Sequence, residues 1–239
     1  LLVQRGIYDF DSAKKFFRPE LSDLHDPFLM LGMEATVERI STAIGSQEKI
    51  MVYGDYDVDG TTSVALVFSY LTSYYSNCIY YIPDRYEEGY GISKKGIDHA
   101  KKESISLIIA LDCGVKAIKK VQYAKDKGID FIICDHHRPG DKLPAAVAVL
   151  DPKRSDCDYP FKELCGCGIG FKLIQALEQK QNESIEDLMP YLDLVATAIG
   201  ADIVPVVGEN RILSYYGLKV LNTKPVSYTH LTLPTIYSV

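Results

Sequence analysis

The stretch Ile50-Met51-Val52-Tyr53-Gly54-Asp55-Tyr56-Asp57-Val58-Asp59-Gly60-Thr61-Thr62 decides the fold. It begins as a short apolar run, places three carboxylates on alternate residues, turns at Gly60 and enters an apolar segment over residues 61–75. This order predicts a buried strand, an acidic loop and a helix. A solvated acidic turn is the simpler alternative for this loop alone. Carboxylates so close together repel one another unless a cation lies between them, so the loop is also a candidate metal site.

The same acidic pattern begins the loop of a calcium-binding EF-hand, and the position of the other ligands excludes that class. An EF-hand loop needs a bidentate Glu at its twelfth position and a helix in front of it. Counted from Asp55, the twelfth residue is Leu66, and the preceding segment has a strand-like pattern.

The composition is that of an ordinary globular protein, with 239 residues, 47% hydrophobic and 24% charged. No apolar run is long enough to span a membrane and no signal-peptide pattern is present, so we expect a cytoplasmic protein without a membrane partner. The net charge of −6 argues against a generally basic nucleic-acid-binding surface. It does not exclude a nuclease, because an acidic metal site contributes to that charge. The chain starts with Leu1, so we expect a fragment or a processed product.

The six cysteines are too sparse for a disulfide scaffold and fit reduced thiols in a core or loop. A zinc site built from Cys157, Cys165 and Cys167 is the less favoured alternative. Its spacing is unusual and a fourth ligand is not evident.

Apolar runs that suit buried strands recur along the chain, at residues 49–53, 78–82, 107–111, 130–134 and 146–150. Helical patterns lie between several of them, at residues 61–75, 93–102 and 115–127. This alternation predicts an α/β fold with a parallel sheet of about five strands and helices on both faces. Further helices are expected in an N-terminal helical segment over residues 1–48, with pieces at 12–17 and 27–45, and after the sheet at 171–180, 185–199 and 210–221.

Parallel sheets of this kind place their ligand site at the carboxyl ends of the strands. Charged or metal-binding residues follow all five predicted strands: Asp55, Asp57 and Asp59; Asp84 and Arg85; Asp112; Asp135, His136 and His137; and Asp151. Carboxylates with some imidazole suit manganese or magnesium better than structural zinc. The ligands are too many for one ion. Two divalent cations are the usual device for hydrolysing phosphate esters, so the rim predicts a two-metal phosphoesterase.

Four segments in order, Gly54–Gly60, Asp112–Gly114, Asp135–His137 and Ala198–Pro205, resemble the motifs of the DHH phosphoesterase superfamily. Within it the chain is most similar to the RecJ family of bacterial 5′→3′ exonucleases specific for single-stranded DNA. The first motif and Glu88-Gly89-Tyr90-Gly91 carry that narrower resemblance. The resemblance extends from about Val3 to Pro225.

The resemblance also implies a role for each site residue. As metal ligands it implies Asp55 on one ion, Asp57 on the other, Asp112 bridging both, and His136 and Asp202 completing the second site. As groups that act around the metals it implies His137 beside the scissile phosphate, Arg85 neutralising that phosphate, and Asp135 and Asp59 orienting the ligands. Tyr53 stands where some relatives have a His that could bind the first metal.

The function implied by the resemblance is manganese- or magnesium-dependent digestion of single-stranded DNA in repair and recombination, with a single-strand-binding protein and a repair helicase as partners. One alternative is a different enzyme of the superfamily, a phosphodiesterase of short oligonucleotides or cyclic dinucleotides, or an enzyme that hydrolyses pyrophosphate. Another is a non-enzymatic replication scaffold, which is disfavoured because such members have lost ligands that are present here. Residues 49–225 form the expected catalytic domain. Residues 226–239 are expected to be a non-native tail in place of the substrate-binding domains that follow in RecJ relatives.

Overall fold

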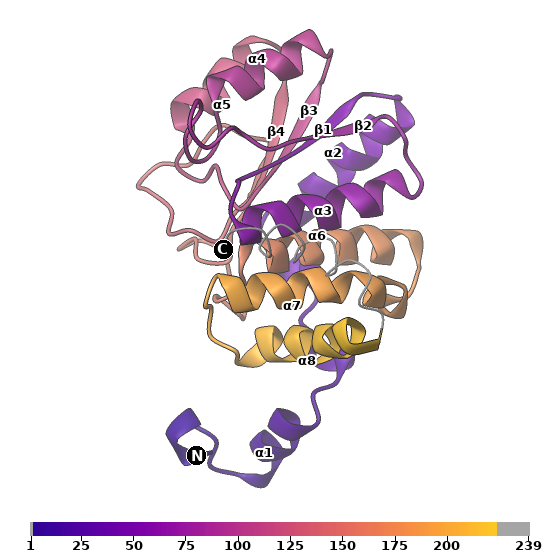
Figure 1. The fold of residues 1–239 in the computed structure, drawn as a ribbon, viewed down its shortest axis with the longest axis vertical. Coiled ribbons are helices and arrows are strands. Elements are labelled where there is room, and N and C mark those ends of the chain that lie inside the picture. Colours follow the sequence, from indigo (N-terminus) through magenta and orange to yellow (C-terminus); the bar gives the residue numbers. More distant parts are fainter. Residues whose placement is uncertain (1, 224–239) are drawn as a thin grey trace, which may run out of the picture.

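The computed structural model describes residues 2–223 and is built around one parallel sheet (Figure 1). Its five strands lie in the order β2-β1-β3-β4-β5 and all neighbours are parallel. They are β1 (Ile50–Gly54), β2 (Cys78–Tyr81), β3 (Leu107–Leu111), β4 (Asp130–Cys134) and β5 (Ala148–Leu150). The predicted fold class is confirmed, with helices on both faces of the sheet and further helices before it.

Both faces of the central strands are buried, which explains why these strands are apolar runs rather than alternating patterns. In β1, Ile50 and Val52 belong to one hydrophobic core, whereas Met51 and Tyr53 belong to a second core on the opposite face. The two cores enclose the sheet and hold its strand ends in place.

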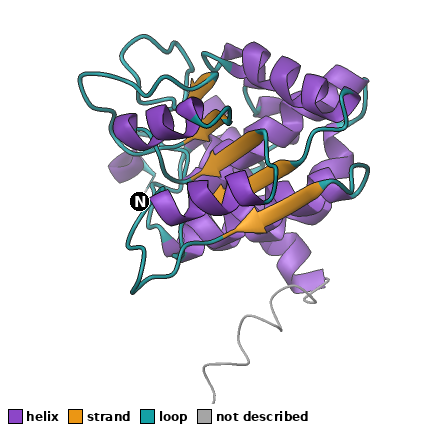
Figure 2. Ribbon diagram, turned by 90° about the horizontal axis from the view of Figure 1, so that it is seen from above, coloured by secondary structure: helices purple, strands orange, loops and turns teal. Residues whose placement is uncertain are grey.

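The helices form layers on the two faces (Figures 1 and 2). The larger core takes in α2 (Met33–Gly45), α3 (Val58–Thr72), α6 (Gly166–Gln181), α7 (Leu192–Ala201) and α8 (Gly208–Thr223). The smaller core takes in α4 (Lys94–Lys102) and α5 (Ile118–Asp126). None of the helices in residues 2–223 combines the length and apolar character that crossing a membrane requires.

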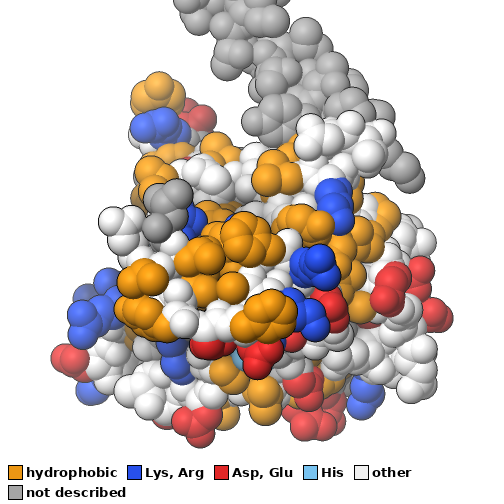
Figure 3. Space-filling view, turned by 90° about the horizontal axis from the view of Figure 1, so that it is seen from below, with side chains coloured by type: hydrophobic (Ala, Val, Ile, Leu, Met, Phe, Trp, Pro, Cys, Tyr) orange, Lys and Arg blue, Asp and Glu red, His pale blue; other side chains and the backbone are white. Residues whose placement is uncertain are grey.

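The first part of the described chain, residues 2–17, contains no buried residue. Its helix α1 (Phe10–Phe17) contains no buried residue, and Phe10 is 80% exposed. Figure 3 shows hydrophobic side chains gathered at this lower end of the molecule. The stability of the domain therefore comes from the two cores around the sheet. The predicted non-native tail, residues 226–239, lies outside the described residues.

The helix after the acidic motif begins earlier than the sequence pattern predicts. Helix α3 starts at Val58, because Asp57 caps it by accepting a hydrogen bond from the Gly60 amide at 2.8 Å. Gly60 therefore lies in the first turn of α3, whereas the sequence pattern predicted a separate turn there before the helix. A Cβ atom there would lie 2.6 Å from the Asp55 carbonyl oxygen, so glycine allows the helix to pack closely on the strand end.

Other predicted helix boundaries also need correction. Helix α6 starts at Gly166 rather than 171, with Cys165 as its N-cap, and the glycine-rich run is helical. The predicted helix 185–199 is a 3₁₀ helix (Ile185–Tyr191) containing Pro190, followed by α7. The predicted piece at 27–45 is divided into a 3₁₀ helix (Pro27–Leu29) and α2, which Gly32 separates with a φ of 95°.

A buried ion pair joins α8 to α6. The Glu209 carboxylate accepts hydrogen bonds from Lys172 Nζ at 2.6 Å, from the Tyr159 hydroxyl at 2.7 Å and from the His25 amide at 3.0 Å. Lys172 is completely buried, and this burial lowers its pKa. Within residues 2–223, Glu209 is the one acidic side chain that lies within ion-pair distance of Lys172, so it alone compensates the ammonium charge.

We expect Glu209→Gln to destabilise the fold by about 3–5 kcal/mol, because it leaves a buried ammonium without its counter-charge. Tyr159→Phe is the matched control. It removes one hydrogen bond to the same carboxylate and should cost about 0.5–1.5 kcal/mol. Urea unfolding of both variants measures the two free energies. Equal losses in the two variants would contradict a dominant role for the ion pair.

Candidate metal centre

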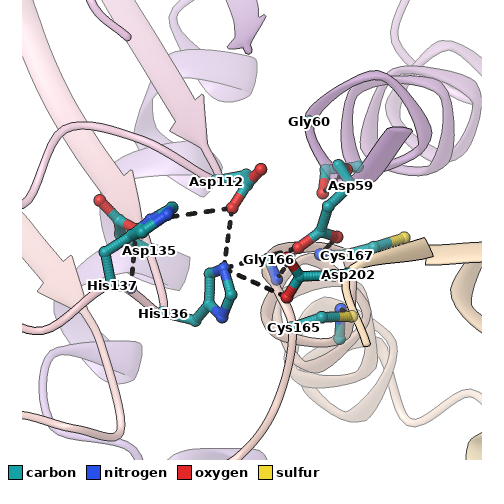
Figure 4. Close-up of polar contacts among 12 residues, drawn as sticks. Asp59, Gly60, Asp112, Asp135, His136, His137, Cys165, Gly166, Cys167 and Asp202 are labelled. Atoms are coloured by element: carbon teal, nitrogen blue, oxygen red, sulfur yellow. Dashed lines mark hydrogen bonds and ion pairs between the residues drawn. The ribbon is translucent and has the colours of Figure 1, made fainter. Parts of the chain in front are cut away.

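The carboxyl ends of the strands and two helix ends bring acidic and imidazole groups together (Figure 4). Asp112 follows β3, and His136 follows β4 after Asp135. Asp59 lies in the first turn of α3, and Asp202 is the C-terminal cap of α7. The sheet, α3 and α7 therefore each contribute side chains to one cluster. The strand order and the packing of α7 against α3 bring these side chains together.

The buried imidazole of His136 lies at the centre of this cluster. Its Nε2 atom is 3.1 Å from Asp112 Oδ1 and 3.7 Å from both Asp59 Oδ2 and Asp202 Oδ2. Two overlapping groups have ligand atoms within 4.8 Å of one another: Asp59, His136 and Asp202, and Asp112, His136 and His137. Carboxylates and imidazole in two overlapping groups are a donor set that suits a pair of divalent cations.

Asp59 is held by the amino terminus of α6. Its two carboxylate oxygens accept hydrogen bonds from the Gly166 amide at 2.6 Å and the Cys167 amide at 2.8 Å. The positive end of the helix dipole favours the charged carboxylate there. The start of α6 also lies close to Asp112, and this approach requires glycine, because a Cβ atom at Gly166 would lie 2.5 Å from the Cβ of Asp112.

Asp112 is buried in a conformation that strains a non-glycine residue, with a φ of 56°. Its Oδ1 atom has no hydrogen-bond partner among the described residues, although it faces His136. Burial, followed by the negative charge of Asp59, raises the pKa of Asp112 to about 10. A carboxylate in this position needs a positive charge beside it, and a divalent cation fits that need.

His137 is oriented by Asp135 and faces solvent. Its Nδ1 atom is 2.8 Å from Asp135 Oδ1, and its side chain is 44% exposed. The hydrogen bond to Asp135 raises the pKa of His137 to about 9. Burial acts to raise the pKa of Asp135, but hydrogen bonds from His137 and from the Val115 amide hold it below its usual value. This geometry can present a positively charged imidazole to an anion.

Asp55 and Asp57 occupy different positions from Asp59. Asp55 is buried, and its two oxygens accept hydrogen bonds from the Tyr56 amide at 2.7 Å and the Gly91 amide at 2.9 Å. Asp57 is exposed at the cap of α3. Within residues 2–223, neither belongs to a group of converging ligand atoms, whereas Asp59 does. The roles of Asp55 and Asp57 as metal ligands therefore remain predictions, and Asp59 is a further candidate ligand.

Arg85 is connected to the centre through aromatic rings. Its guanidinium lies 5.4 Å from the centre of the Tyr56 ring, which meets the Tyr90 ring edge-on at 5.8 Å. Tyr90 in turn meets His137 edge-on at 6.3 Å. Arg85 is exposed and lies at the outer end of this row.

Tyr53 points away from the metal cluster into the second core, where it stacks on Tyr81 with ring centres 5.4 Å apart. Its hydroxyl donates to the Gly91 carbonyl at 3.0 Å and accepts from the Ser93 amide at 3.0 Å. Tyr53 therefore positions the loop whose Gly91 amide contacts Asp55. The position of Tyr53 in this core could have been predicted, because successive residues of a strand point to opposite faces. Its contact with the Gly91 loop leaves no signal in the sequence.

The three cysteines that were considered for zinc are buried and not disulfide-bonded. Cys165 caps α6, with its Sγ atom accepting from the Gly168 amide at 3.3 Å. The Cys167 amide holds Asp59, a contribution that sequence reasoning missed because it comes from the backbone.

We expect Gly166→Ala to lower manganese affinity about 10–100-fold, because the new methyl group displaces Asp112 and weakens the support of Asp59. Gly168→Ala is the control in the same helical turn, since its nearest contact is the end of the Leu164 side chain at 3.2 Å. Calorimetric titration with manganese measures both affinities. A similar effect of the two substitutions would contradict this role of Gly166.

Comparison with known proteins places the chain among phosphoesterases. Residues 49–199 match the DHH family, N-terminal domain. The chain is 43% identical to the single-stranded-DNA-specific exonuclease RecJ of Bacillus subtilis, over 92% of this chain and 27% of the relative. It is 40% identical to RecJ of Escherichia coli, over 78% of this chain and 34% of the relative. The chain thus spans about a third or less of these relatives.

Solved structures give the same relationship. A crystal structure of exonuclease RecJ bound to manganese superposes with a TM-score of 0.74 at 29% identity, covering 84% of this chain and 49% of that one. A structure of RecJ from Thermus thermophilus in complex with Mn²⁺ superposes with a TM-score of 0.75 at 25% identity, covering 91% of this chain and 30% of that one. These similarities support the sheet and the helical layers around it.

Proposed function

The chain belongs to the DHH family, and from this membership we propose that it is the catalytic part of a metal-dependent 5′→3′ exonuclease of single-stranded DNA. The observation that carries the proposal is the convergence of Asp59, Asp112 and Asp202 on His136. Relatives at 43% and 40% identity are named single-stranded-DNA-specific exonucleases, which supports the choice of substrate.

The metal ligands that we propose combine the geometry with the family resemblance. The converging Asp59, His136 and Asp202 would hold one cation, where the family resemblance adds Asp57. Asp112 would be shared with a second cation, for which the resemblance implies Asp55. Asp55 supports the acidic motif through the Tyr56 and Gly91 amides. Manganese or magnesium bound here would lower the pKa of a coordinated water and balance the charge of the scissile phosphate. Relatives crystallised with manganese support this choice.

The side chains around the metals position the phosphate. His137, held by Asp135, offers its exposed imidazole to a non-bridging phosphate oxygen and neutralises charge there. Arg85 lies farther out, beyond Tyr56, and we propose that it attracts the strand before it reaches the centre. Its long side chain and planar guanidinium suit phosphate binding.

The biological setting is also a proposal. The family resemblance supports a role in DNA repair and recombination, with a single-strand-binding protein and a repair helicase as partners. Six cysteines that are all buried and free fit a reducing compartment such as the cytoplasm.

Digestion of end-labelled DNA tests the proposed function. The chain, with and without manganese, is incubated with single-stranded DNA labelled at its 5′ or 3′ end, with the duplex form, and with a cyclic dinucleotide. We expect metal-dependent release of mononucleotides from the 5′ end of the single strand, at a low rate that falls steeply as salt rises, because the acidic chain neutralises few phosphates. Cleavage of the cyclic dinucleotide alone would favour the other phosphodiesterase class, and no cleavage with bound metal would favour a scaffold.

A further inference from the structure

Asp151, which follows β5, is a buried carboxylate to which the proposed chemistry gives no role. Its Oδ1 atom accepts a hydrogen bond from the Lys153 amide at 2.8 Å, which forms a tight turn after the strand. Its Oδ2 atom has no hydrogen-bond partner among residues 2–223. The turn explains the first oxygen only, so the second is available for another contact.

The buried imidazole of His136 also has an atom without a partner. Its Nε2 atom faces the three carboxylates of the cluster. Its Nδ1 atom points away from them in Figure 4 and has no hydrogen-bond partner in the described part of the chain. A metal ion at Nε2 leaves the proton of the neutral ring on Nδ1, which is then a donor. Because a buried donor without an acceptor is unfavourable, metal binding at His136 calls for an acceptor next to Nδ1.

The fold places Asp151 beside His136. Strand β5 lies next to β4, and the pairing of Cys134 with Leu150 brings the residues after the two strands together. The Asp135 amide donates to the Leu150 carbonyl at 2.9 Å, which continues this pairing beyond the strand ends. Burial raises the pKa of Asp151 to about 6, and His136 is among the groups near enough for their charge to act on that pKa. Asp151 is therefore a buried acceptor close to the imidazole.

The other buried side-chain atoms without a partner do not fit this role. Within residues 2–223 they are the Tyr70 hydroxyl, Asp112 Oδ1 and Asn210 Oδ1. Asp112 Oδ1 faces the opposite ring nitrogen, Nε2. Tyr70 lies near the C-terminal end of α3, and Asn210 lies in α8. Asp151 Oδ2 is the acceptor that remains for the Nδ1 atom of His136.

We propose that Asp151 is a positioning residue for His136 and that one water molecule joins the two side chains. The imidazole donates from Nδ1 to the water, and the water donates to Asp151 Oδ2. A water that joins two buried polar groups is a common part of protein interiors and serves nearly as well as a direct hydrogen bond. The contact fixes the orientation of the ring and keeps the Nε2 lone pair directed at the metal position. The inference rests on the proposed metal centre and adds the support of its central imidazole.

Two substitutions of similar size test the proposal. Asp151→Asn and Asp151→Leu both remove the charge, but only Asn retains an oxygen that can accept a hydrogen bond. We expect Asp151→Leu to weaken manganese binding about tenfold or more, and Asp151→Asn to stay within about threefold of the unaltered chain. Asp158→Ala removes an exposed carboxylate from the same loop and should leave the affinity unchanged. Calorimetric titration with manganese, without DNA, measures the affinities.

Combination with His136→Ala shows whether Asp151 acts through the imidazole. If it does, Asp151→Leu and Asp151→Asn should have equal manganese affinities once the imidazole has been removed. A purely structural role of the turn would give the same difference between the two variants in both backgrounds. Thermal unfolding without metal checks that each variant is folded. If Asp151→Leu does not fold, Asp151→Ala replaces it, because it also lacks the acceptor and has the same expected loss.

The outcomes are distinguishable from those of the exonuclease assay. Equal manganese affinities of Asp151→Leu and Asp151→Asn overturn the positioning role even if the chain digests DNA. The same difference between them with and without the His136 imidazole also overturns it. A preference for Asn over Leu that disappears in the His136→Ala background supports it. If such a chain digests no DNA, the positioning role stands and the proposed exonuclease function is overturned instead.

Discussion

Asp112→Asn is expected to abolish manganese-dependent hydrolysis, with a loss of about a thousandfold or more. Asp112 belongs to the strand end that faces His136, and we propose that it is shared by both cations. Metal charge stabilisation in phosphate hydrolysis is worth several kcal/mol, and about 4 kcal/mol corresponds to that factor. Asn is the sharper variant because it keeps the shape of Asp and tolerates the positive φ of 56°.

The same substitution should leave the metal-free fold at least as stable as before. The raised pKa of Asp112 means that burying its charge opposes folding near neutral pH, and Asn carries no charge. Asp84→Ala is the control, since Asp84 is an exposed carboxylate that follows β2. Activity is measured by release of labelled nucleotides, and stability by thermal unfolding without metal. Near-normal turnover of Asp112→Asn would reject the shared-ligand assignment.

Substitutions of the two adjacent histidines are expected to have different effects on manganese affinity and on the rate of hydrolysis. His136→Ala removes the imidazole on which three carboxylates converge, so manganese affinity should fall by about 100-fold. His137 is exposed and bonded to Asp135, so His137→Ala should keep manganese affinity within a few-fold while hydrolysis slows by about 100-fold.

Each histidine variant is the matched control for the other, because the two residues are neighbours of the same type. Calorimetric titration with manganese gives the affinities, and single-turnover digestion gives the rates. Equal losses of affinity would show that both imidazoles are metal ligands.

The sheet could be predicted from sequence because burial of both faces leaves a strong local signal. The run 107–111 is apolar throughout, and the structure gives the same bounds for β3. Helix starts were predicted less well, because they depend on contacts distant in sequence. Gly166 begins α6 where its amide meets Asp59, a partner 107 residues away, and a glycine-rich run gives no local sign of that contact.

The site was predictable as a region but not atom by atom. Rules for parallel sheets place the residues after β1, β3 and β4 together, and Asp112 and His136 are indeed neighbours. Which carboxylate of the first motif reaches His136 depends on where α3 begins. Because Asp57 caps the helix, Asp59 turns toward α6, whereas Asp55 stays in the strand exit with the Gly91 amide.

The support of Asp59 by the α6 amides has a consequence for the order of events during synthesis on the ribosome. When β5 has been made, Asp59 and Asp112 already exist, but the amides of Gly166 and Cys167 and the carboxylate of Asp202 have not yet been translated. Chains grow from the amino terminus, so the carboxylate of Asp59 has no hydrogen bonds from the α6 amides until α6 has been made and packs on the sheet. A nascent or truncated chain that stops before residue 202 therefore cannot assemble a complete hydrolytic centre. Completion of α7 is therefore the step at which the set of candidate metal ligands becomes whole.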